Sequence, residues 1–369
     1  MRHPWRLLKS ALPIFAIVVL AGLLSGCGGP FPQSALRPAS DFARSLDDLF
    51  RGIFFWAVIV FVLVEGALLV AVFRFRDREG KRDAEHVHGN TILEISWTIA
   101  PAIILVLIAV PTIRTIWEVD RPSTDPDALL IEAVGRQWWW EFRYPEFGIV
   151  TANEIHVPVG RTIDIRLTSA DVIHSFWFPR AGGKRDVIPG HENQLWFKMD
   201  SVGVFPGQCA EFCGLSHALM KMEMVSESVE DFEAWVAQQQ RPALGTGDTA
   251  PPAEPQEGDE GEEIPEPRAD PLDAGLRDVL DAGNQAFLGS GCIACHRIEG
   301  TVAAGVLGPD LTHVGSRRTI AAGILENTPD NMALWLRDPA SVKPGVLMPT
   351  LNLDEDTIRT LVAYLESLK

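Results

Sequence analysis

Two long apolar runs constrain the fold of this 369-residue chain more than any other feature of its sequence. They cover residues 50–73 and 92–117. Each is longer than the roughly 20 residues that a helix needs to cross the hydrocarbon core of a bilayer. Because no water is available in lipid to pair with the backbone, such runs cross as helices. The sequence therefore predicts a two-helix transmembrane hairpin, which we place at residues 49–118.

The connection between the two runs is strongly basic. It carries five cationic side chains close to the membrane: Arg74, Arg76, Arg78, Lys81 and Arg82. Loops on the cytoplasmic side are enriched in Lys and Arg. We therefore expect this loop in the cytoplasm, and the segments before and after the hairpin on the other side of the membrane.

The N-terminus has the pattern of an export signal. A basic start, MRHPWRLLK, precedes an apolar run at residues 11–24, which ends in LSGC at Cys27. A charged start, a short apolar stretch and small residues are typical of a secretory signal. The LSGC box resembles that of bacterial lipoproteins, which implies cleavage after residues 1–26 and a lipid on Cys27, ahead of an N-terminal segment at 27–48. An uncleaved additional membrane helix is the alternative.

The pattern of apolar and polar residues changes after the hairpin. Apolar and polar residues alternate in ALLIEAV, EIHVPVG and TIDIRLTS, and Gly or Pro stands at the breaks. A period of two is typical of half-buried strands. Several such runs predict a small β-sandwich or barrel, which we place at residues 119–238.

A loop in this region carries the side chains of a metal site. In CAEFCGLSHALM, Cys209, Cys213, His217 and Met220 have the spacing C-x-x-x-C-x-x-x-H-x-x-M. Thiolates, a thioether and an imidazole are ligands that copper selects, whereas zinc sites rarely use methionine. Two thiolates can bridge two copper ions with one histidine for each, and His174, in DVIHSFWFP, is the best candidate for the second histidine. A disulfide and a core methionine are the alternative.

A second chemical motif lies near the C-terminus. Cys292, Cys295 and His296 form C-x-x-C-H, in which two thiols can bond a haem and the histidine can bind its iron. A redox dithiol or half of a zinc site is the alternative. LGPDLTHVGSR follows, and then Met348 before a proline and a final amphipathic run. We expect Met348 to be the sixth iron ligand and Met332, on an apolar helical stripe, to be a core residue.

The copper loop and its surroundings resemble the CuA site of cytochrome c oxidase subunit II. RQWWWEF at 136–142 resembles the tryptophan-rich strand through which electrons enter that family, although Trp139 stands where tyrosine is common. The resemblance implies a cupredoxin-like fold and six copper ligands: His174, Cys209, Glu211 through its carbonyl, Cys213, His217 and Met220. It also implies that the Glu211 carboxylate faces a magnesium ion shared with the catalytic subunit.

Residues 276–369 resemble a class I c-type cytochrome domain, in which the carbonyl of Pro309 orients the iron-binding histidine. The fold class expected is thus a multi-domain membrane protein with a transmembrane hairpin, an all-β cupredoxin-like domain and an all-α cytochrome c domain. This order resembles subunit II of caa-type haem–copper oxidases.

The stretch between these two domains, at 239–275, is rich in Pro, Gly, Glu and Asp. Residues 241–271 hold nine acids and two arginines, so they contribute −7 to the total charge of −17. This composition is typical of a disordered tether. About thirty such residues have a root-mean-square span of roughly 30 Å, which makes docking of the haem domain on the copper domain intramolecular. The acidic balance argues against nucleic acid as a partner and is compatible with a basic electron donor.

The resemblance implies an electron relay in an oxidoreductase. A soluble or membrane cytochrome c would reduce the haem, and the electron would enter the copper pair near Trp138. It would then pass to subunit I, where oxygen is reduced and protons are pumped, since this chain has no oxygen-reducing site. Glu94 matches the family position near a proton path, with a headgroup contact as its alternative, and Glu65 receives no role. We expect the complex, with its other subunits, in the bacterial inner membrane, with the copper and haem domains on the periplasmic side.

Three other classes of protein fit the sequence less well. A quinol-oxidase subunit of this fold would lack the copper ligands. A nitrous oxide reductase would carry a large propeller domain. A copper chaperone would have no use for a covalent haem.

Overall fold

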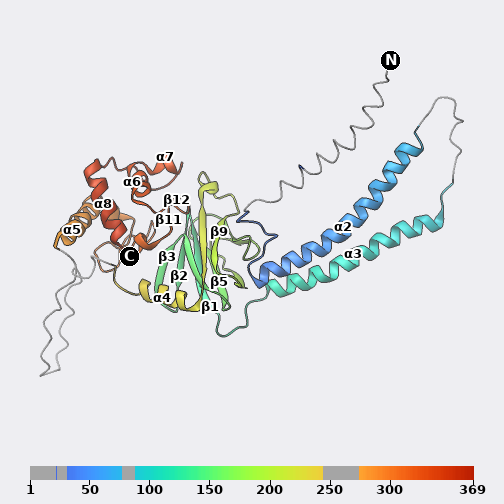
Figure 1. Ribbon diagram of the computed structural model, residues 1–369, viewed down its shortest axis with the longest axis horizontal. Helices are drawn as coiled ribbons and strands as arrows, with labels where there is room; N and C mark the ends of the chain where they lie inside the picture. The colour runs from blue at the N-terminus through green and yellow to red at the C-terminus, as the bar shows by residue number, and fades with distance from the viewer. Residues whose placement is uncertain (1–21, 23–30, 77–87, 244–273) are drawn as a thin grey trace, which may run out of the picture.

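The computed structural model describes residue 22 and residues 31–76, 88–243 and 274–369. The predicted signal sequence with Cys27, the loop residues Arg78, Lys81 and Arg82, and most of the linker lie outside this part. The described chain forms a helical hairpin, a central β domain and a helical C-terminal domain, arranged in that order along the long axis (Figure 1).

Two long helices form the hairpin, α2 (Asp41–Arg74) and α3 (Thr91–Asp120). Both are long and apolar enough to cross a membrane, and each contains one of the predicted apolar windows. The side chain of Asn90 caps α3 by accepting the N–H groups of Ile92 and Leu93. Most apolar side chains of the hairpin are exposed, as expected of a surface that faces lipid.

Helix α2 begins nine residues before the apolar window because its first turn belongs to the β domain. The Ser40 hydroxyl caps the helix by accepting the Ala43 N–H at 3.0 Å. Phe42 is buried in the core of the β domain, where a Cβ added at Gly182 would lie 3.1 Å from its ring. The Lys198 N–H donates to Asp41 Oδ1 at 2.8 Å. These contacts fix the end of the hairpin to the β domain.

The β domain is a sandwich of two five-stranded sheets with strand orders β3-β2-β1-β5-β8 and β4-β10-β9-β6-β7. The strands are β1 (Leu129–Arg136), β2 (Trp139–Tyr144), β3 (Ile149–Ala152), β4 (Glu154–Pro158), β5 (Thr162–Ser169), β6 (His174–Trp177), β7 (Arg185–Val187), β8 (Asn193–Lys198), β9 (Gly203–Cys209) and β10 (Lys221–Glu227). This confirms the predicted all-β, cupredoxin-like architecture.

The apolar residues of the alternating sequence pattern form the core of the sandwich. Strands β1 and β5 pair in parallel with Leu129 opposite Ile163 and Ile131 opposite Ile165, and all four side chains are fully buried. Burying each such side chain stabilises the fold by roughly 1.5–3 kcal/mol. The helix α4 (Val229–Gln239) follows β10 and packs Phe232 and Val236 on the same core.

The C-terminal domain has a separate core. Its helices are α5 (Ala274–Gly289), α6 (Pro329–Arg337), α7 (Pro339–Val342) and α8 (Glu355–Ser367), with short strands β11 (Thr319–Ile320) and β12 (Leu325–Glu326). Helices α5 and α8 cross closely because Gly283 has no side chain, and a Cβ there would lie 2.2 Å from Tyr364 Cβ. The domain lies against one end of the β sandwich, with β11 and β12 next to it (Figure 1).

Candidate copper and haem centres

The loop with the predicted copper ligands is closed by strand pairing. It leaves β9 at Cys209, passes through a short 3₁₀ turn at His217–Leu219 and enters β10 after Met220. Strands β9 and β10 are antiparallel, and the Cys209 N–H donates to the Met220 carbonyl at 2.9 Å. The first and last donors of the loop are therefore fixed by the sheet.

The two cysteines face each other, and each faces its own histidine. The sulfurs of Cys209 and Cys213 are 3.8 Å apart. His174 Nδ1 lies 3.9 Å from the Cys209 sulfur, and His217 Nδ1 lies 3.6 Å from the Cys213 sulfur. A disulfide would require sulfurs about 2.05 Å apart, and both cysteines are free. The geometry favours the metal-site interpretation over the disulfide.

The two remaining predicted donors join the same cluster. Met220 Sδ lies 3.8 Å from the Cys213 sulfur, and the Glu211 carbonyl oxygen lies 3.2 Å from the Cys209 sulfur. The ligand atoms of His174, Cys209 and Cys213 all lie within 4.8 Å of one another. Paired soft sulfurs, each beside an imidazole, fit two copper ions. The Glu211 side chain is exposed, so its carboxylate is accessible to a partner.

The orientation of His174 depends on an aspartate that the sequence analysis missed. His174 Nε2 lies 2.8 Å from Asp171 Oδ1, which leaves Nδ1 directed at the thiols. The other carboxylate oxygen of Asp171 accepts the Gln137 N–H at 2.6 Å. Gly135 was also missed, and a Cβ there would lie 2.7 Å from His174 Cδ2. The three-residue spacing of Asp171 and His174 was the one available signal.

The two thiols have pKa values that are shifted in opposite directions. The hydrogen bond between the two sulfurs lowers the pKa of Cys209 to about 3 and raises the pKa of Cys213. Burial alone lowers the pKa of His174, but its hydrogen bonds to Asp171 and Cys209 raise it overall. The hydrogen bond thus favours the thiolate of Cys209, and thiolates are the form that binds metals.

The three predicted tryptophans are all buried, and Trp138 contacts the copper loop directly. Its indole N–H donates to the Cys213 carbonyl at 3.0 Å, and the Gln137 side-chain amide donates to the same oxygen at 2.7 Å. Trp140 packs instead on His174, with 5.9 Å between the ring centroids. Trp139 stacks under the guanidinium of Arg136.

The C-x-x-C-H motif forms a tight turn in the C-terminal domain. The His296 N–H donates to the Cys292 carbonyl at 3.0 Å, and Cys292 and Cys295 are free and half-buried. His296 Nδ1 lies 2.8 Å from the Pro309 carbonyl oxygen, which leaves Nε2 for a metal. Burial lowers the pKa of His296, so its ring is neutral near pH 7, as an iron ligand must be.

The two methionines of this domain differ in their surroundings. Met332 is 2% exposed within α6, which confirms it as a core residue. Met348 is half-buried and packs at the margin of the same core, as does Cys292. A Cβ added at Gly308 would lie 2.6 Å from His296 Cε1, so glycine at this position leaves room for the imidazole ring. These residues fit a haem held by two thiols and a histidine.

The carboxylates of the hairpin lie apart from both clusters. Glu94 is in the first turn of α3, at the end far from the β domain, and is exposed (Figure 1). Glu65 is half-buried within α2.

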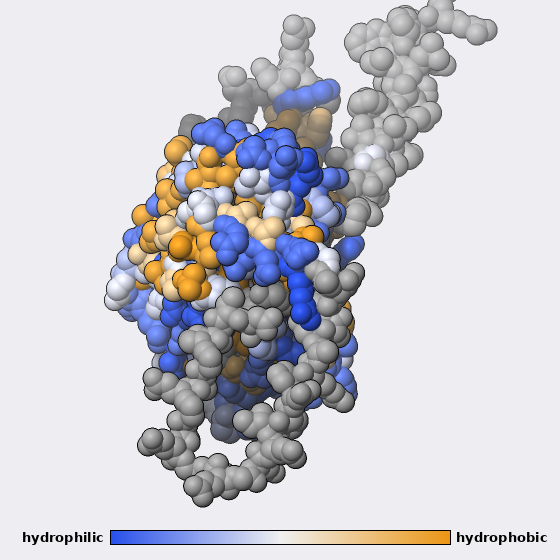
Figure 2. Space-filling model, turned by 90° about the vertical axis from the view of Figure 1, so that its left-hand side faces the viewer, coloured by the Kyte–Doolittle hydropathy of each residue, from blue (hydrophilic) through white to orange (hydrophobic). Residues whose placement is uncertain are grey.

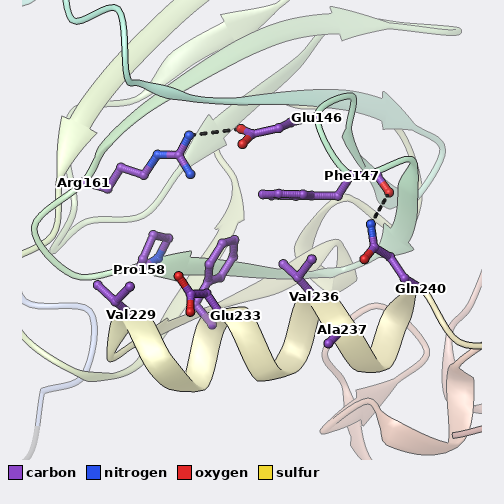
Figure 3. A pocket seen from close by; sticks show the side chains of 10 residues that line it. Glu146, Phe147, Pro158, Arg161, Val229, Glu233, Val236, Ala237 and Gln240 are labelled. Carbon is purple, nitrogen blue, oxygen red and sulfur yellow. Dashed lines mark hydrogen bonds and ion pairs between the residues drawn. The ribbon is translucent and has the colours of Figure 1, made fainter.

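A groove beside α4 offers no comparable chemistry. It runs between α4 and the β sandwich, bordered by the ion pair of Arg161 with Glu146 at 3.0 Å and by the hydrogen bond from Gln240 to the Phe147 carbonyl (Figure 3). Its lining holds no cysteine, histidine or methionine. We therefore assign no metal or haem function to it.

Fold and donor sets together define a class: a membrane-anchored electron-transfer protein with a cupredoxin-like domain and a cytochrome c domain. Three family profiles match the chain in the same order. They describe the transmembrane domain of cytochrome c oxidase subunit II at residues 32–115, its periplasmic domain at 148–229 and cytochrome c at 280–369.

Known proteins match all or part of the chain. Cytochrome c oxidase subunit 2 of Alkalihalophilus pseudofirmus is 35% identical over 99% of each chain. Quinol oxidase subunit 2 of Bacillus spizizenii is 32% identical over 65% of this chain and 75% of its own. The crystal structure of the periplasmic domain of subunit II of cytochrome oxidase from Bradyrhizobium japonicum is 35% identical, with a TM-score of 0.31, over 32% of this chain and 97% of that one. The chain belongs to the cytochrome c oxidase subunit 2 family and is part of an oxidoreductase complex.

Proposed function

We propose that this chain is the subunit through which electrons enter a respiratory haem–copper oxidase. In this proposal, a cytochrome c donor reduces a covalent haem c on this chain. The electron then passes through a binuclear CuA centre to the catalytic subunit, which reduces oxygen and pumps protons. The observation that carries the proposal is the convergence of two free thiols, each with its own imidazole, on one loop of the β domain.

The copper pair would be held by the thiolates of Cys209 and Cys213, with His174 and His217 at either side. Met220 and the carbonyl of Glu211 would supply the weaker outer ligands. When bound, such a pair supplies a one-electron carrier. The role of the β sandwich is to fix these donors before the metal arrives, through the β9–β10 pairing and the Asp171 hydrogen bond.

The haem would be bonded to Cys292 and Cys295, with His296 and Met348 as iron ligands. Support for access by an external donor comes from the outer face of this domain, where apolar residues gather on the surface (Figure 2). The exposed apolar side chains of the domain include Val302, Val306, Leu307 and Leu347. Such a surface is typical of an interaction site.

Three finer points belong to the same proposal. The exposed Glu211 carboxylate would bind magnesium together with the catalytic subunit. Glu94, at the far end of α3, would lie near a proton path on the cytoplasmic side. The hairpin would cross the bacterial inner membrane, with both electron-carrying domains on the periplasmic side.

The test is purification of the oxidase from its native membrane, followed by metal analysis and spectroscopy. We expect two copper ions per chain, a near-infrared band of a mixed-valence pair, haem c that stays on the chain under denaturation, and a co-purifying multi-span haem protein. Replacing Cys209 and Cys213 by serine removes the copper, whereas the matched double variant Cys292→Ser/Cys295→Ser leaves the copper in place. Full copper content in the double variant contradicts the proposal.

A quinol-oxidase subunit is the second candidate because a relative of that description matches part of the chain. The purified complex distinguishes the two. Oxidation of reduced cytochrome c with the near-infrared copper band favours our proposal, whereas quinol oxidation without copper in this chain favours the other.

A further inference from the structure

The segment just before Met348 lies directly on the copper loop. Ser216, which is fully buried, donates its hydroxyl proton to the Pro344 carbonyl. A Cβ added at Gly345 would lie 2.7 Å from Leu215 Cβ. The part of the haem domain that carries the predicted iron ligand therefore contacts the copper loop between Cys213 and His217.

Lys343 begins this segment and is buried between the two domains. It is 2% exposed, and its ammonium donates to the Trp138 carbonyl at 2.6 Å and to the Ala321 carbonyl at 3.4 Å. In the described ranges, no carboxylate lies within ion-pair distance of it. Burial lowers the pKa of Lys343 to about 7, and the nearby Cys213 opposes this shift. Its partners lie on both domains, so the contact is formed only when they are docked.

Arg318 and Lys221 make further contacts between the domains. The Arg318 N–H donates to Glu154 Oε2 at 2.9 Å, and its guanidinium pairs with Glu223 at 3.2 Å. The Lys221 N–H donates to the Ala322 carbonyl at 3.1 Å. The Arg318–Glu223 ion pair is partly exposed, and such pairs contribute little to stability. Lys343 and Ser216 both make buried polar contacts across the interface beside the copper loop, and of the two only Lys343 bonds to both domains.

Trp138 links the two sides. Its carbonyl accepts from Lys343, while its indole N–H donates to the Cys213 carbonyl. A displacement of Lys343 therefore changes the distance between the haem domain and a copper ligand through two hydrogen bonds. Electron transfer weakens steeply with distance, so this position matters more than an equal displacement at Arg318 or Lys221.

We propose that Lys343 is a positioning residue that locks the haem domain onto the copper loop in the arrangement that transfers electrons. The inference rests on the proposed function, since it requires both carriers to be present. It adds the docking face and the residue that fixes it.

The test compares Lys343→Met with Lys369→Met in the purified, full oxidase. Both variants remove one lysine of the same domain, but Lys369 is exposed at the C-terminus. A hydrogen bond to a charged group stabilises a contact enough to change its equilibrium constant about tenfold or more. We expect the haem-to-copper transfer rate to fall at least about tenfold in Lys343→Met and to stay unchanged in the control, with haem reduction by a chemical donor unchanged in both.

A second measurement is independent of turnover. Hydrogen exchange of the backbone amides of Lys221 and Arg318, which bond across the interface, is expected to accelerate in Lys343→Met and not in Lys369→Met. An unchanged transfer rate, or a slower rate with unchanged exchange and a shifted copper potential, overturns the inference. The second result would show that Lys343 acts by its charge and not by position.

Two further controls keep the result interpretable. If Lys343→Met does not assemble, Lys343→Ala takes its place, because it also removes the N–H donor, and an unchanged rate there also overturns the inference. If the wild-type oxidase contains both carriers and still transfers no electron from haem to copper, the proposed function itself is wrong. The two failures are therefore distinguishable.

Discussion

The carboxylate of Asp171 orients a predicted copper ligand, and its removal gives a measurable loss of copper affinity. In Asp171→Ala, His174 loses the acceptor 2.8 Å from Nε2, and the Gln137 N–H loses its acceptor at 2.6 Å. The ring then keeps its packing against Trp140 but loses the hydrogen bond that helps to direct Nδ1 at the thiols.

The exposure of Asp171 sets the size of the effect. Loss of a residue that orients a metal ligand typically costs 10- to 100-fold in affinity. The Asp171 side chain is 31% exposed, so water can replace part of the lost hydrogen bonding. We therefore expect the lower end, about tenfold, which corresponds to ~1.4 kcal/mol.

The assay is a chelator titration of the purified oxidase, followed by copper analysis and by the near-infrared absorption of the metal pair. Asp127→Ala is the matched control, because it removes an exposed aspartate from the loop before β1. Copper loss in Asp171→Ala at the same chelator concentration as in wild type would refute the orienting role. Copper loss in both variants would point to a general effect of charge.

Three further predictions test other parts of the molecule. Gly308→Ala places a methyl group 2.6 Å from His296 Cε1. We expect the haem to stay covalently attached while its iron–histidine absorption changes, and the free energy of unfolding of the domain to fall by about 1–3 kcal/mol. Optical spectra and thermal unfolding measure these two effects. Ile165→Ala opens a cavity in the fully buried β-sandwich core and should lower the free energy of unfolding by about 2–5 kcal/mol in denaturant titration of the copper-loaded protein. Burial alone lowers the pKa of His156, but its hydrogen bonds to two flanking carboxylates raise it overall, above the ordinary 6.5. Its stabilising contribution is therefore complete below pH 6.5 and lost as the pH rises through the raised value, so the melting temperature should fall over that range in wild type and stay flatter in His156→Gln.

The structure also explains why the sequence predicted the role of some site residues and not of others. Cys209, Cys213, His217 and Met220 lie on one short loop, so their spacing alone indicated a shared site. His174 was found because its apolar surroundings indicated a strand end, although 35 residues separate it from Cys209. Asp171 is marked in the sequence only by its three-residue spacing from His174, and the fold brings its carboxylate to the imidazole.

The start of α2 shows the limit of pattern reading in the same way. Apolar composition located the part of the helix that meets lipid, because that surface must be continuously apolar. The first turn at Phe42 and Ala43 has no such composition, and it is helical because Ser40 caps it and the β domain covers it.

The sequence by itself indicated the membrane hairpin, the alternating strands, the Cys209–Met220 loop and the Cys292–His296 motif, because each depends on residues close together in the chain. Tertiary structure alone decided the docking of the haem domain. Lys343 and Trp138 are 205 residues apart, and no local pattern marks a lysine that will be buried against a distant carbonyl. The physical reason is that burial and hydrogen-bond partners arise only when separate segments pack, and packing fixes which of many similar side chains face each other.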